Sequence, residues 1–553
     1  MNKQAFKDKL IEGFKQKRFL LFCLAYLLLP VPLLTPIAHN IGFSDCLWAI
    51  FFSVLLLLSL FVFLQFFRIK TVKLCCTVLL IFTVVPSAIF IAYLLFAQAF
   101  LLSDSITSIF ETNPEESKEF IAYYMNPFIT AGIIAYISIP VFMILKMRAS
   151  HVISIGRHKL AFTLVITVLL LFVTFRPAAH SVYFINFYKT YIQYKKRHYN
   201  EKKEIASRLK QPFAVTKLQP DTVGQTLVVV IGESLTRRHM SLYGYGRKTN
   251  VLLHRGDSSL AVYDDVVSPQ VHTIPVIRKV MTFLERSHAD YFSSRPSLFE
   301  LFNRAGYETY FISNQPYGGR YETSYDLLLT QAKHQHDPSL HKKPDGVVLP
   351  YLQEALAEKK KNKLIVIHLM GNHMAYVFRY PKQYDVFHND SDGFIRSKAK
   401  YMTPEARKTI DRYDNSVLYN DFVVSSIIRQ VKASKASSAV VYFSDHGEEV
   451  YEMRDFAGHA YEKVSSYMCE IPFLVWRSPS FGRYRTDLTF DPARRFSTAD
   501  FLYSFTDLAG LRYQNFDATR SLLNQSFKPR ERYFGEYTYK DVKDMTANME
   551  GSK

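Results

Sequence analysis

Five apolar stretches in the first third of the chain restrict what this sequence can fold into. Each is close to the length of about 20 residues that a helix needs to cross the hydrocarbon core of a membrane. No small-residue cleavage site follows the first stretch and further apolar runs do, so we expect an uncleaved anchor rather than a secretion signal. The sequence therefore predicts a membrane α-helical domain with five spans in residues 1–180. The spans are expected at roughly residues 19–39, 44–66, 74–102, 121–145 and 160–176.

The basic residues between these stretches predict the orientation. The N-terminus and the second and fourth connections are rich in Lys and Arg, whereas the first has none and the third has only Lys118. Because basic loops stay in the cytoplasm, an odd number of spans delivers everything after Arg176 to the outer face. The net charge of +19 then indicates membrane lipids and phosphorylated glycans as partners, since an exported domain meets no nucleic acid.

Two further regions follow the spans. Aromatic and basic residues alternate at helical spacing from Tyr183 to Lys210, which predicts an interfacial or bridging helix and linker over residues 181–220, aromatic face toward the bilayer; a solvated linker helix is the alternative. Cys469 is the one cysteine beyond the spans, so the exported part can form no internal disulfide.

Residues 221–553 read as an α/β domain. Short, continuously apolar runs alternate with longer amphipathic ones, as expected for a mainly parallel sheet covered by helices on both faces. A long helix is expected over residues 408–432, and Gly306 fits a helix C-terminal cap. In such sheets ligands gather beyond the carboxyl ends of the strands. The clearest expected strands begin at Thr226, Glu308, Lys363, Ser438 and Pro472.

Two of these strands end in groups that can bind a metal. Glu233 follows the first strand, and Asp445 and His446 follow the fourth. Two carboxylates and an imidazole at one sheet edge make a plausible zinc site, although each motif alone is commonly a loop charge or a cap. Thr273 precedes an expected helix starting near Ile274, where free amide groups favour a phosphate; the alternative is an ordinary N-cap.

The order of the motifs IGES, RRHMSLYGYGRKT, HTIPV, HLMGNH, FRYP, YDNSVLYND and FSDHGEEVYE resembles the phosphoethanolamine transferases of Gram-negative inner membranes. These are relatives of alkaline phosphatase and the sulfatases, and the resemblance extends over essentially the whole chain. It implies a Zn²⁺ cofactor held by Glu233, Thr273, Asp445 and His446, with Thr273 also the nucleophile.

The resemblance implies further site residues. His373 and His459 would hold a second zinc or bind the phosphoryl group, and Asn314 would lie near that group. A lysine that some relatives carry shortly after this asparagine is absent. Ser108, Thr112 and Glu116, in the third connection, would hold the donor head group, with Ser108 in place of the family's asparagine; a solvated loop is the alternative.

The function implied is transfer of phosphoethanolamine from phosphatidylethanolamine to lipopolysaccharide by a multi-pass inner-membrane protein with a periplasmic catalytic domain. The group would pass through a phosphoethanolamine-threonine ester, releasing diacylglycerol. The motif sequences are most similar to those of the family branch that modifies a core heptose. Lipid A is the alternative acceptor. A glycerophosphate transferase or sulfatase-like hydrolase, and a non-catalytic membrane scaffold, are alternative classes.

Overall fold

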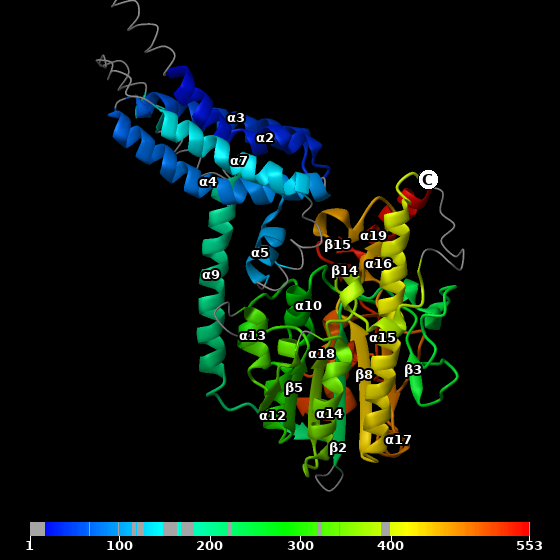
Figure 1. Ribbon diagram of the computed structural model, residues 1–553. Helices are drawn as coiled ribbons and strands as arrows, with labels where there is room; N and C mark the ends of the chain where they lie inside the picture. The colour runs from blue at the N-terminus through cyan, green and yellow to red at the C-terminus, as the bar shows by residue number, and fades with distance from the viewer. Residues whose placement is uncertain are drawn as a thin grey trace, which may run out of the picture. The chain divides into compact units, whose positions relative to one another are not determined.

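The chain forms two compact units, Met1–Lys196 and Arg197–Lys553, and each is described here by itself. A computed structural model gives the coordinates (Figure 1). It describes residues 17–65, 67–97, 99–112, 118, 127–147, 163–164, 166–167, 182–218, 224–317, 323–341, 343–388 and 399–551.

The first unit consists of apolar helices. Phe43–Leu64 (α3) and Ile69–Leu95, within α4 (Ile69–Ala97), are long and apolar enough to cross a membrane. A helix over Lys17–Leu28 continues into Pro30–Ile37 with a bend of 58°, because Pro30 cannot donate the helical hydrogen bond. The described residues thus hold two candidate spans, or three if the bent pair is one.

The fourth and fifth predicted spans are only partly covered. Helix α7 (Pro127–Lys146) lies where the fourth is expected, but its apolar segment Thr130–Lys146 is shorter than the full-length spans. Nearly all of the fifth lies outside the described residues. The number five therefore stays a prediction. The short helices of this unit are α2 (Pro30–Leu34) and α5 (Ser103–Glu111).

Helix α9 (Tyr183–Arg208) is present as predicted, and part of its aromatic face packs against other helices. The Tyr183 hydroxyl lies 2.6 Å from the Ser87 hydroxyl of α4. Phe187 is 5% exposed and packs edge-on against Phe110 of α5. Helices of the first unit thus cover part of this face, while Tyr191 on the same face is 39% exposed, and its placement on the bilayer stays a prediction. The basic residues Lys189, Lys195 and Lys196 are exposed.

The second unit is built on a seven-stranded sheet in the order β3-β11-β8-β2-β7-β5-β6. Five neighbouring strands are parallel, and β11 runs antiparallel between β8 and β3. The predicted mainly parallel sheet and its five clearest strands are confirmed. The strands are β2 (Gln225–Gly232), β3 (Leu260–Val262), β5 (Glu308–Ser313), β6 (His334–His336), β7 (Lys363–His368), β8 (Ser437–Ser444) and β11 (Phe473–Arg477).

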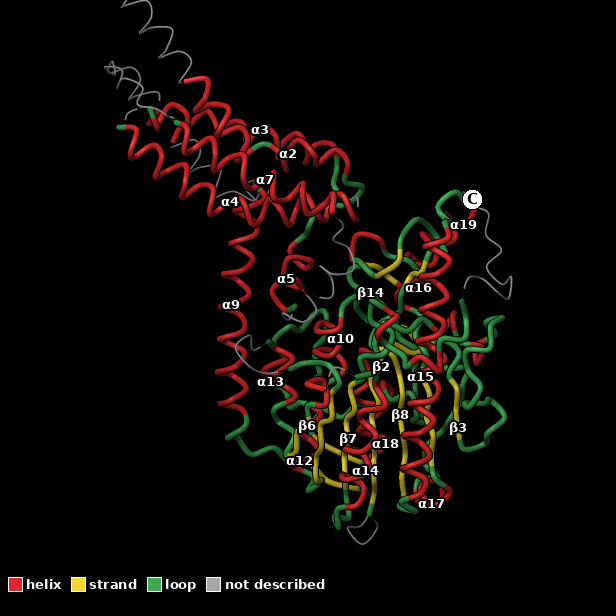
Figure 2. The backbone as a smooth tube through the Cα atoms, viewed as in Figure 1, coloured by secondary structure: helices red, strands yellow, loops and turns green. Residues whose placement is uncertain are grey.

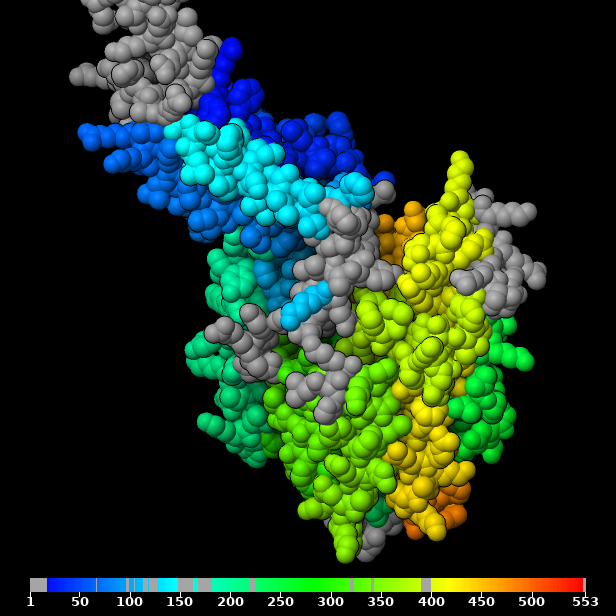
Figure 3. Space-filling model, viewed as in Figure 1, coloured from blue at the N-terminus to red at the C-terminus, as the bar shows by residue number. Residues whose placement is uncertain are grey.

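Helices cover both faces of this sheet, as Figure 2 shows. One face packs against α10 (Thr273–Val280), α12 (Leu298–Arg304), α13 (Ser324–Leu329) and α18 (Phe501–Ala509). The other packs against α14 (Val348–Ala357) and α15 (Pro404–Ala433), whose side chains cover the sheet toward the viewer in Figure 3. The alternation of strand residues between the two cores explains why these strands are apolar throughout. Gly306 follows α12 with φ of +79°, confirming the predicted cap.

Smaller elements complete the second unit. Four two-stranded ribbons pair β1 (Val215–Lys217) with β13 (Leu511–Tyr513), β4 (Val266–Val267) with β12 (Phe496–Ser497), β9 (Glu449–Val450) with β10 (Ala457–Gly458), and β14 (Tyr533–Phe534) with β15 (Tyr537–Thr538). The remaining helices are α11 (Tyr291–Ser294), α16 (Ser466–Cys469), α17 (Pro479–Tyr484) and α19 (Tyr539–Gly551). Cys469 is a buried free thiol.

Candidate active site and metal centre

Register brings the predicted metal ligands together. Strands β2 and β8 are parallel, and Gly232 of the first pairs with Ser444 of the second. The next residue on each strand is an acid, so Glu233 and Asp445 leave the same edge of the sheet side by side. His446 follows Asp445 directly. The expected convergence at the carboxyl edge is thus found.

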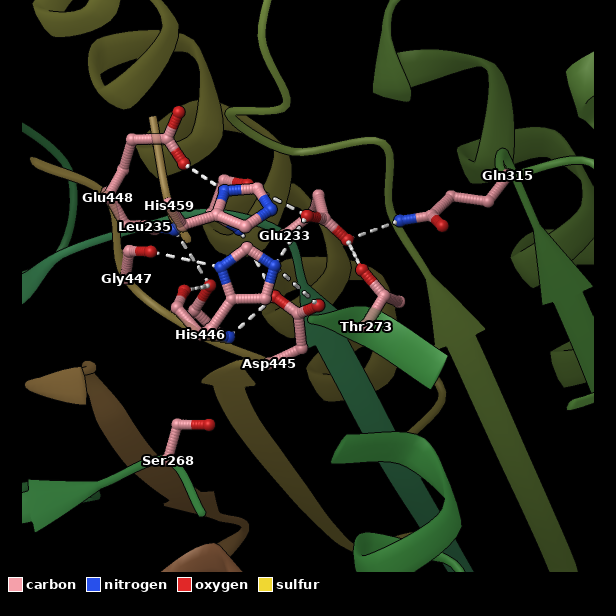
Figure 4. Close-up of polar contacts among 12 residues, drawn as sticks. Glu233, Leu235, Ser268, Thr273, Gln315, Asp445, His446, Gly447, Glu448 and His459 are labelled. Carbon is pink, nitrogen blue, oxygen red and sulfur yellow. Dashed lines mark hydrogen bonds and ion pairs between the residues drawn. The ribbon is translucent and has the colours of Figure 1, made fainter. Parts of the chain in front are cut away.

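The side chains of Glu233, Asp445 and His446 are fully buried, with 0% exposure each. His446 Nε2 lies 3.1 Å from Glu233 Oε1 and 3.4 Å from Asp445 Oδ2, as Figure 4 shows. His446 Nδ1 donates to the Gly447 carbonyl over 2.9 Å. A hydrogen bond from the far ring nitrogen is how proteins orient a metal-binding imidazole, so Nε2 is the nitrogen presented to the two carboxylates.

Backbone groups hold the Asp445 carboxylate. Its Oδ1 accepts from the Ser234 and His446 amides at 3.1 and 2.7 Å, and Ser234 takes up the left-handed conformation with φ of 55° to do so. By contrast, Asp445 Oδ2 and His446 Nε2 are buried without a hydrogen-bond partner in the described structure. Buried polar atoms are normally satisfied. These two atoms face Glu233 and are potential metal ligands without a partner, so they fit a cation such as zinc.

The charges of these three side chains shift one another's pKa values. Burial acts to raise the pKa of Glu233, but the charges of His446 and His373 together with hydrogen bonding outweigh it and hold that pKa well below its usual range. Burial, together with the neighbouring charge of Glu233, raises the pKa of Asp445 well above its usual value. Burial opposes the protonation of His446, but the two carboxylates raise its pKa to about 10. A bound cation would take the place of that proton.

Thr273 lies against this group. It is the first residue of α10, and His272, not Thr273, occupies the N-cap position. Pro275 is tolerated in the first turn because amide groups there have no helical partner. The Thr273 hydroxyl donates to Glu233 Oε2 over 2.8 Å, so its side chain does not cap the helix. The arrangement places a hydroxyl between a buried carboxylate and the positive end of a helix.

Two glycines of the motifs allow the close packing. Gly371, in HLMGNH, has φ of +52°, and a Cβ there would lie 2.6 Å from the Glu233 amide nitrogen. The neighbouring Asn372 amide donates to the Glu233 carbonyl over 2.9 Å. Gly447, in SDHGEE, has no room for a side chain beside the Tyr467 carbonyl. These two glycines thus allow the backbone segments that carry the proposed ligands to pack closely.

The predicted additional histidines lie close by. His459 packs its ring 4.1 Å from that of His446, measured between centroids, and its Nδ1 lies 2.8 Å from Glu448 Oε2. Glu448 also accepts from the Tyr376 hydroxyl over 2.6 Å, and burial raises its pKa to about 7. His446, Glu448 and His459 offer atoms close enough to share an ion. The charge of His373 acts on Glu233.

Asn314 and its neighbour Gln315 have different surroundings. The Asn314 side-chain nitrogen donates to the Lys343 carbonyl and to Asp345 Oδ1 at 3.0 and 2.9 Å. Gln315 instead donates to Glu233 Oε2 over 2.9 Å. The sequence analysis missed Gln315, and its position two residues after the end of β5 was the available signal. The role of Asn314 beside a phosphoryl group stays a prediction.

Other predicted residues lie in the first unit. Ser108 is half-buried in α5, and the exposed Thr112, its C-cap, donates its hydroxyl to the Ser108 carbonyl over 2.9 Å. Glu116 lies outside the described residues.

His272 of the second unit was also missed by the sequence analysis, although it directly precedes Thr273. Burial lowers its pKa well below the usual range, and its ring lies 5.1 Å from that of His459.

Known proteins are similar to this chain over most of its length. The family model described as Sulfatase matches residues 225–511. Phosphoethanolamine transferase EptC of Escherichia coli K12 is 31% identical over 481 residues, which cover 80% of this chain and 81% of EptC. The chain belongs to the phosphoethanolamine transferase family. The predicted family and its alkaline phosphatase and sulfatase kinship are therefore confirmed.

Two solved structures extend the comparison. The zinc complex of the C-terminal periplasmic domain of E. coli EptC is 34% identical, with a TM-score of 0.55, and covers 58% of this chain and 92% of its own. The integral membrane protein lipooligosaccharide phosphoethanolamine transferase A of Neisseria meningitidis is 18% identical, with a TM-score of 0.67, and covers 93% of this chain and 99% of its own. The second likeness shows that the family's membrane-plus-α/β fold extends over nearly the whole chain.

Proposed function

We propose that this protein transfers phosphoethanolamine from phosphatidylethanolamine to lipopolysaccharide, with Thr273 carrying the group between the two. The observation that carries the proposal is the 2.8 Å hydrogen bond from the Thr273 hydroxyl to Glu233, beside the orphaned atoms of Asp445 and His446. A hydroxyl is a weak nucleophile unless a base or metal activates it. Among the described residues, Thr273 is the only threonine that donates a hydrogen bond to the Glu233 carboxylate.

The four residues Glu233, Thr273, Asp445 and His446 would hold zinc, whose chemistry here would be to lower the pKa of the threonine hydroxyl and to neutralise phosphoryl charge. Glu233 orients the hydroxyl, and Gln315 donates to the same Glu233 oxygen. His373 and His459 lie near the ligand group and would hold a second zinc or the phosphoryl oxygens. The zinc complex of the EptC domain supports the choice of metal.

The reaction proceeds in two displacements. In the first, Thr273 Oγ1 forms a bond to phosphorus, the bond from phosphorus to the glycerol oxygen breaks, and diacylglycerol leaves with the threonine proton. The free amides at the start of α10 face the phosphoryl oxygens. In the second, an acceptor hydroxyl forms the new bond to phosphorus, the threonine ester breaks, and the acceptor's proton returns to Thr273.

The family resemblance supports our assignment of the donor and the acceptor. Ser108, Thr112 and Glu116 would bind the ethanolamine ammonium, with Glu116 as its counter-charge. The name of the Neisseria protein supports a lipopolysaccharide-type acceptor. We assign a core heptose as the modified sugar, with lipid A as the alternative, in a multi-pass protein of the inner membrane whose second unit is periplasmic. Mass spectrometry of lipopolysaccharide with and without the gene would locate the added group.

The test is a covalent adduct at one residue. The full-length protein in nanodiscs of phosphatidylethanolamine, without acceptor, should accumulate a phosphoethanolamine ester on Thr273, detected by peptide mass spectrometry. Thr273→Ala should lose the adduct and at least about 1,000-fold in transfer, while Thr273→Ser should retain part of both because the hydroxyl remains. An adduct on another residue, or transfer by the alanine variant, would reject the proposal.

A further inference from the structure

A cavity of about 500 Å³ lies within the second unit, and α10, the helix that begins with Thr273, forms part of its wall. It is lined by Lys279 of α10, by Ala499 and Asp500 of the turn that packs against α10, and by residues of the segment 527–533. None of the four proposed zinc ligands lines it. Its volume is in the range of small-molecule sites.

The walls of this cavity are strongly basic. Glu285, Asp500 and Glu531 are its three acidic lining residues. The cationic lining residues are Lys279, Arg286, Arg495, Arg520, Arg530 and Arg532.

Most of these cations already have acidic partners. Arg520 pairs with Asp500 and Glu285, and Arg530 lies 3.3 Å from the same Asp500. Arg532 pairs with Asp265 over 2.6 Å, and Arg286 with Glu536 over 2.6 Å. The third acid, Glu531, accepts from the Tyr533 hydroxyl. The acids around the cavity are therefore engaged.

Lys279 and Arg495 are the exceptions. Neither side chain makes a hydrogen bond or an ion pair among the described residues. Lys279 is half-buried, and burial, reinforced by the charge of Arg286, lowers its pKa to about 8. The charge of Glu536 acts in the opposite direction, but a half-buried ammonium with no ion-pair partner in contact is unfavourable unless an anion joins it. Arg495 is exposed, and its planar guanidinium suits two-point contact with a phosphate.

We propose that this cavity binds a phosphorylated sugar of the acceptor glycan, with Lys279 and Arg495 as its anion-binding pair. The assignment rests on the proposed function, since it names the acceptor feature that the second displacement would recognise. Lys279 is six residues after Thr273 on one helix, which corresponds to about 9 Å of rise. A sugar phosphate held at Lys279 would thus place a neighbouring sugar within reach of the threonine ester.

The experiment separates acceptor recognition from chemistry. The full-length protein in nanodiscs is compared with the double variant Lys279→Met/Arg495→Met, with the charge-retaining Lys279→Arg/Arg495→Lys, and with Lys359→Met as a control. Lys359 is an exposed lysine that does not line the cavity. The measurements are KM for purified lipopolysaccharide, kcat, formation of the Thr273 ester without acceptor, and competition by glucose 1-phosphate against neutral glucose.

The double methionine variant should raise the acceptor KM about 10-fold, with kcat and ester formation unchanged. Glucose 1-phosphate, but not glucose, should compete with the acceptor in the parent and lose this effect in the double variant, while the other two variants behave like the parent. An unchanged KM, or equal competition by both sugars, would overturn the inference while leaving transfer itself intact. If the Thr273 ester never forms, the proposed function fails, and direct calorimetric binding of glucose 1-phosphate to parent and double variant still decides the cavity's role.

Discussion

Among the described residues of the second unit, two buried histidines lie between two carboxylates each, and one of the two is built like a metal site. His446 lies with Glu233 and Asp445 at the sheet edge. His239 lies between Asp414 and Glu452. Both imidazoles are nearly or fully inaccessible. In both clusters burial opposes protonation and the carboxylates raise the histidine pKa to about 10.

The hydrogen bonds separate the two clusters. Each His239 ring nitrogen contacts a carboxylate, and the second oxygen of Asp414 accepts from Tyr245 and Arg247, both over 2.9 Å. Both His239 nitrogens and both Asp414 oxygens therefore have partners, and the contact joins the RRHMSLYGYGRKT loop to helix α15. His446 and Asp445 instead keep orphaned atoms. The residue types and the histidine pKa are therefore alike in the two clusters, and the unsatisfied ligand atoms beside Glu233 distinguish the proposed metal site.

Loss of a proposed ligand gives the largest expected effect. Asp445→Asn and His446→Gln should each release zinc and lower transfer by on the order of 10⁴-fold, comparable to the loss of one member of a catalytic unit. The reason is that each substitution replaces one of the two buried atoms, Asp445 Oδ2 and His446 Nε2, that have no hydrogen-bond partner among the described residues. Metal analysis and a transfer assay of the full-length variants provide the check. Full zinc content and activity in both variants would make the two clusters equivalent.

The His239 cluster should fail in a different way. His239→Gln leaves buried carboxylates without their counter-charge and should cost about 3–5 kcal/mol of stability, while zinc content stays at the parent level. Trp476 of β11 is 2% exposed, and the other tryptophan is Trp48 of the first unit. Fluorescence-detected unfolding in a Trp48→Phe background therefore reports the second unit. Zinc loss without a stability change would contradict the assignment.

Glu448 tests how far the metal site extends. Its carboxylate holds His459, so Glu448→Gln should weaken zinc binding about 10- to 100-fold at a second site while the first zinc stays bound. Tyr376→Phe is the matched control, since it removes one hydrogen bond to the same carboxylate and keeps the charge. Zinc titration followed by calorimetry measures both. Identical titrations for parent and Glu448→Gln would exclude His459 as a ligand.

The smallest expected effect is a pH slope. Because folding raises the pKa of His239 from its usual value near 6.5 to about 10, its stabilisation is complete below about pH 6.5 and is lost as the pH rises toward 10. In zinc-saturated protein the slope should be about 1.4 kcal/mol per pH unit in this window. His239→Gln should lack that component. Parallel stability curves for the two proteins between pH 7 and 9 would show that His239 is neutral in the folded state.

Much of the fold follows from local patterns. The continuous apolar runs predicted β2, β5, β7, β8 and β11, because residues on both faces of a central strand are buried. The strand ends also pointed to Glu233, Asp445 and His446, since parallel strands finish at one edge. The antiparallel direction of β11 is not visible in the sequence, because a short apolar run has the same composition in either direction.

The sequence by itself determined the apolar helices, the order of strands along the chain and the residue types at the strand ends, because these are encoded within windows of a few residues. Tertiary structure alone decided which donor atoms stay unsatisfied, since the partners of Glu233 and Asp445 lie up to 211 residues away. It also decided that α9 turns part of its aromatic face to α4 and α5, and that Lys279 and Arg495 share one cavity. Periodicity shows that a side chain needs a partner, and only packing shows which partner it has.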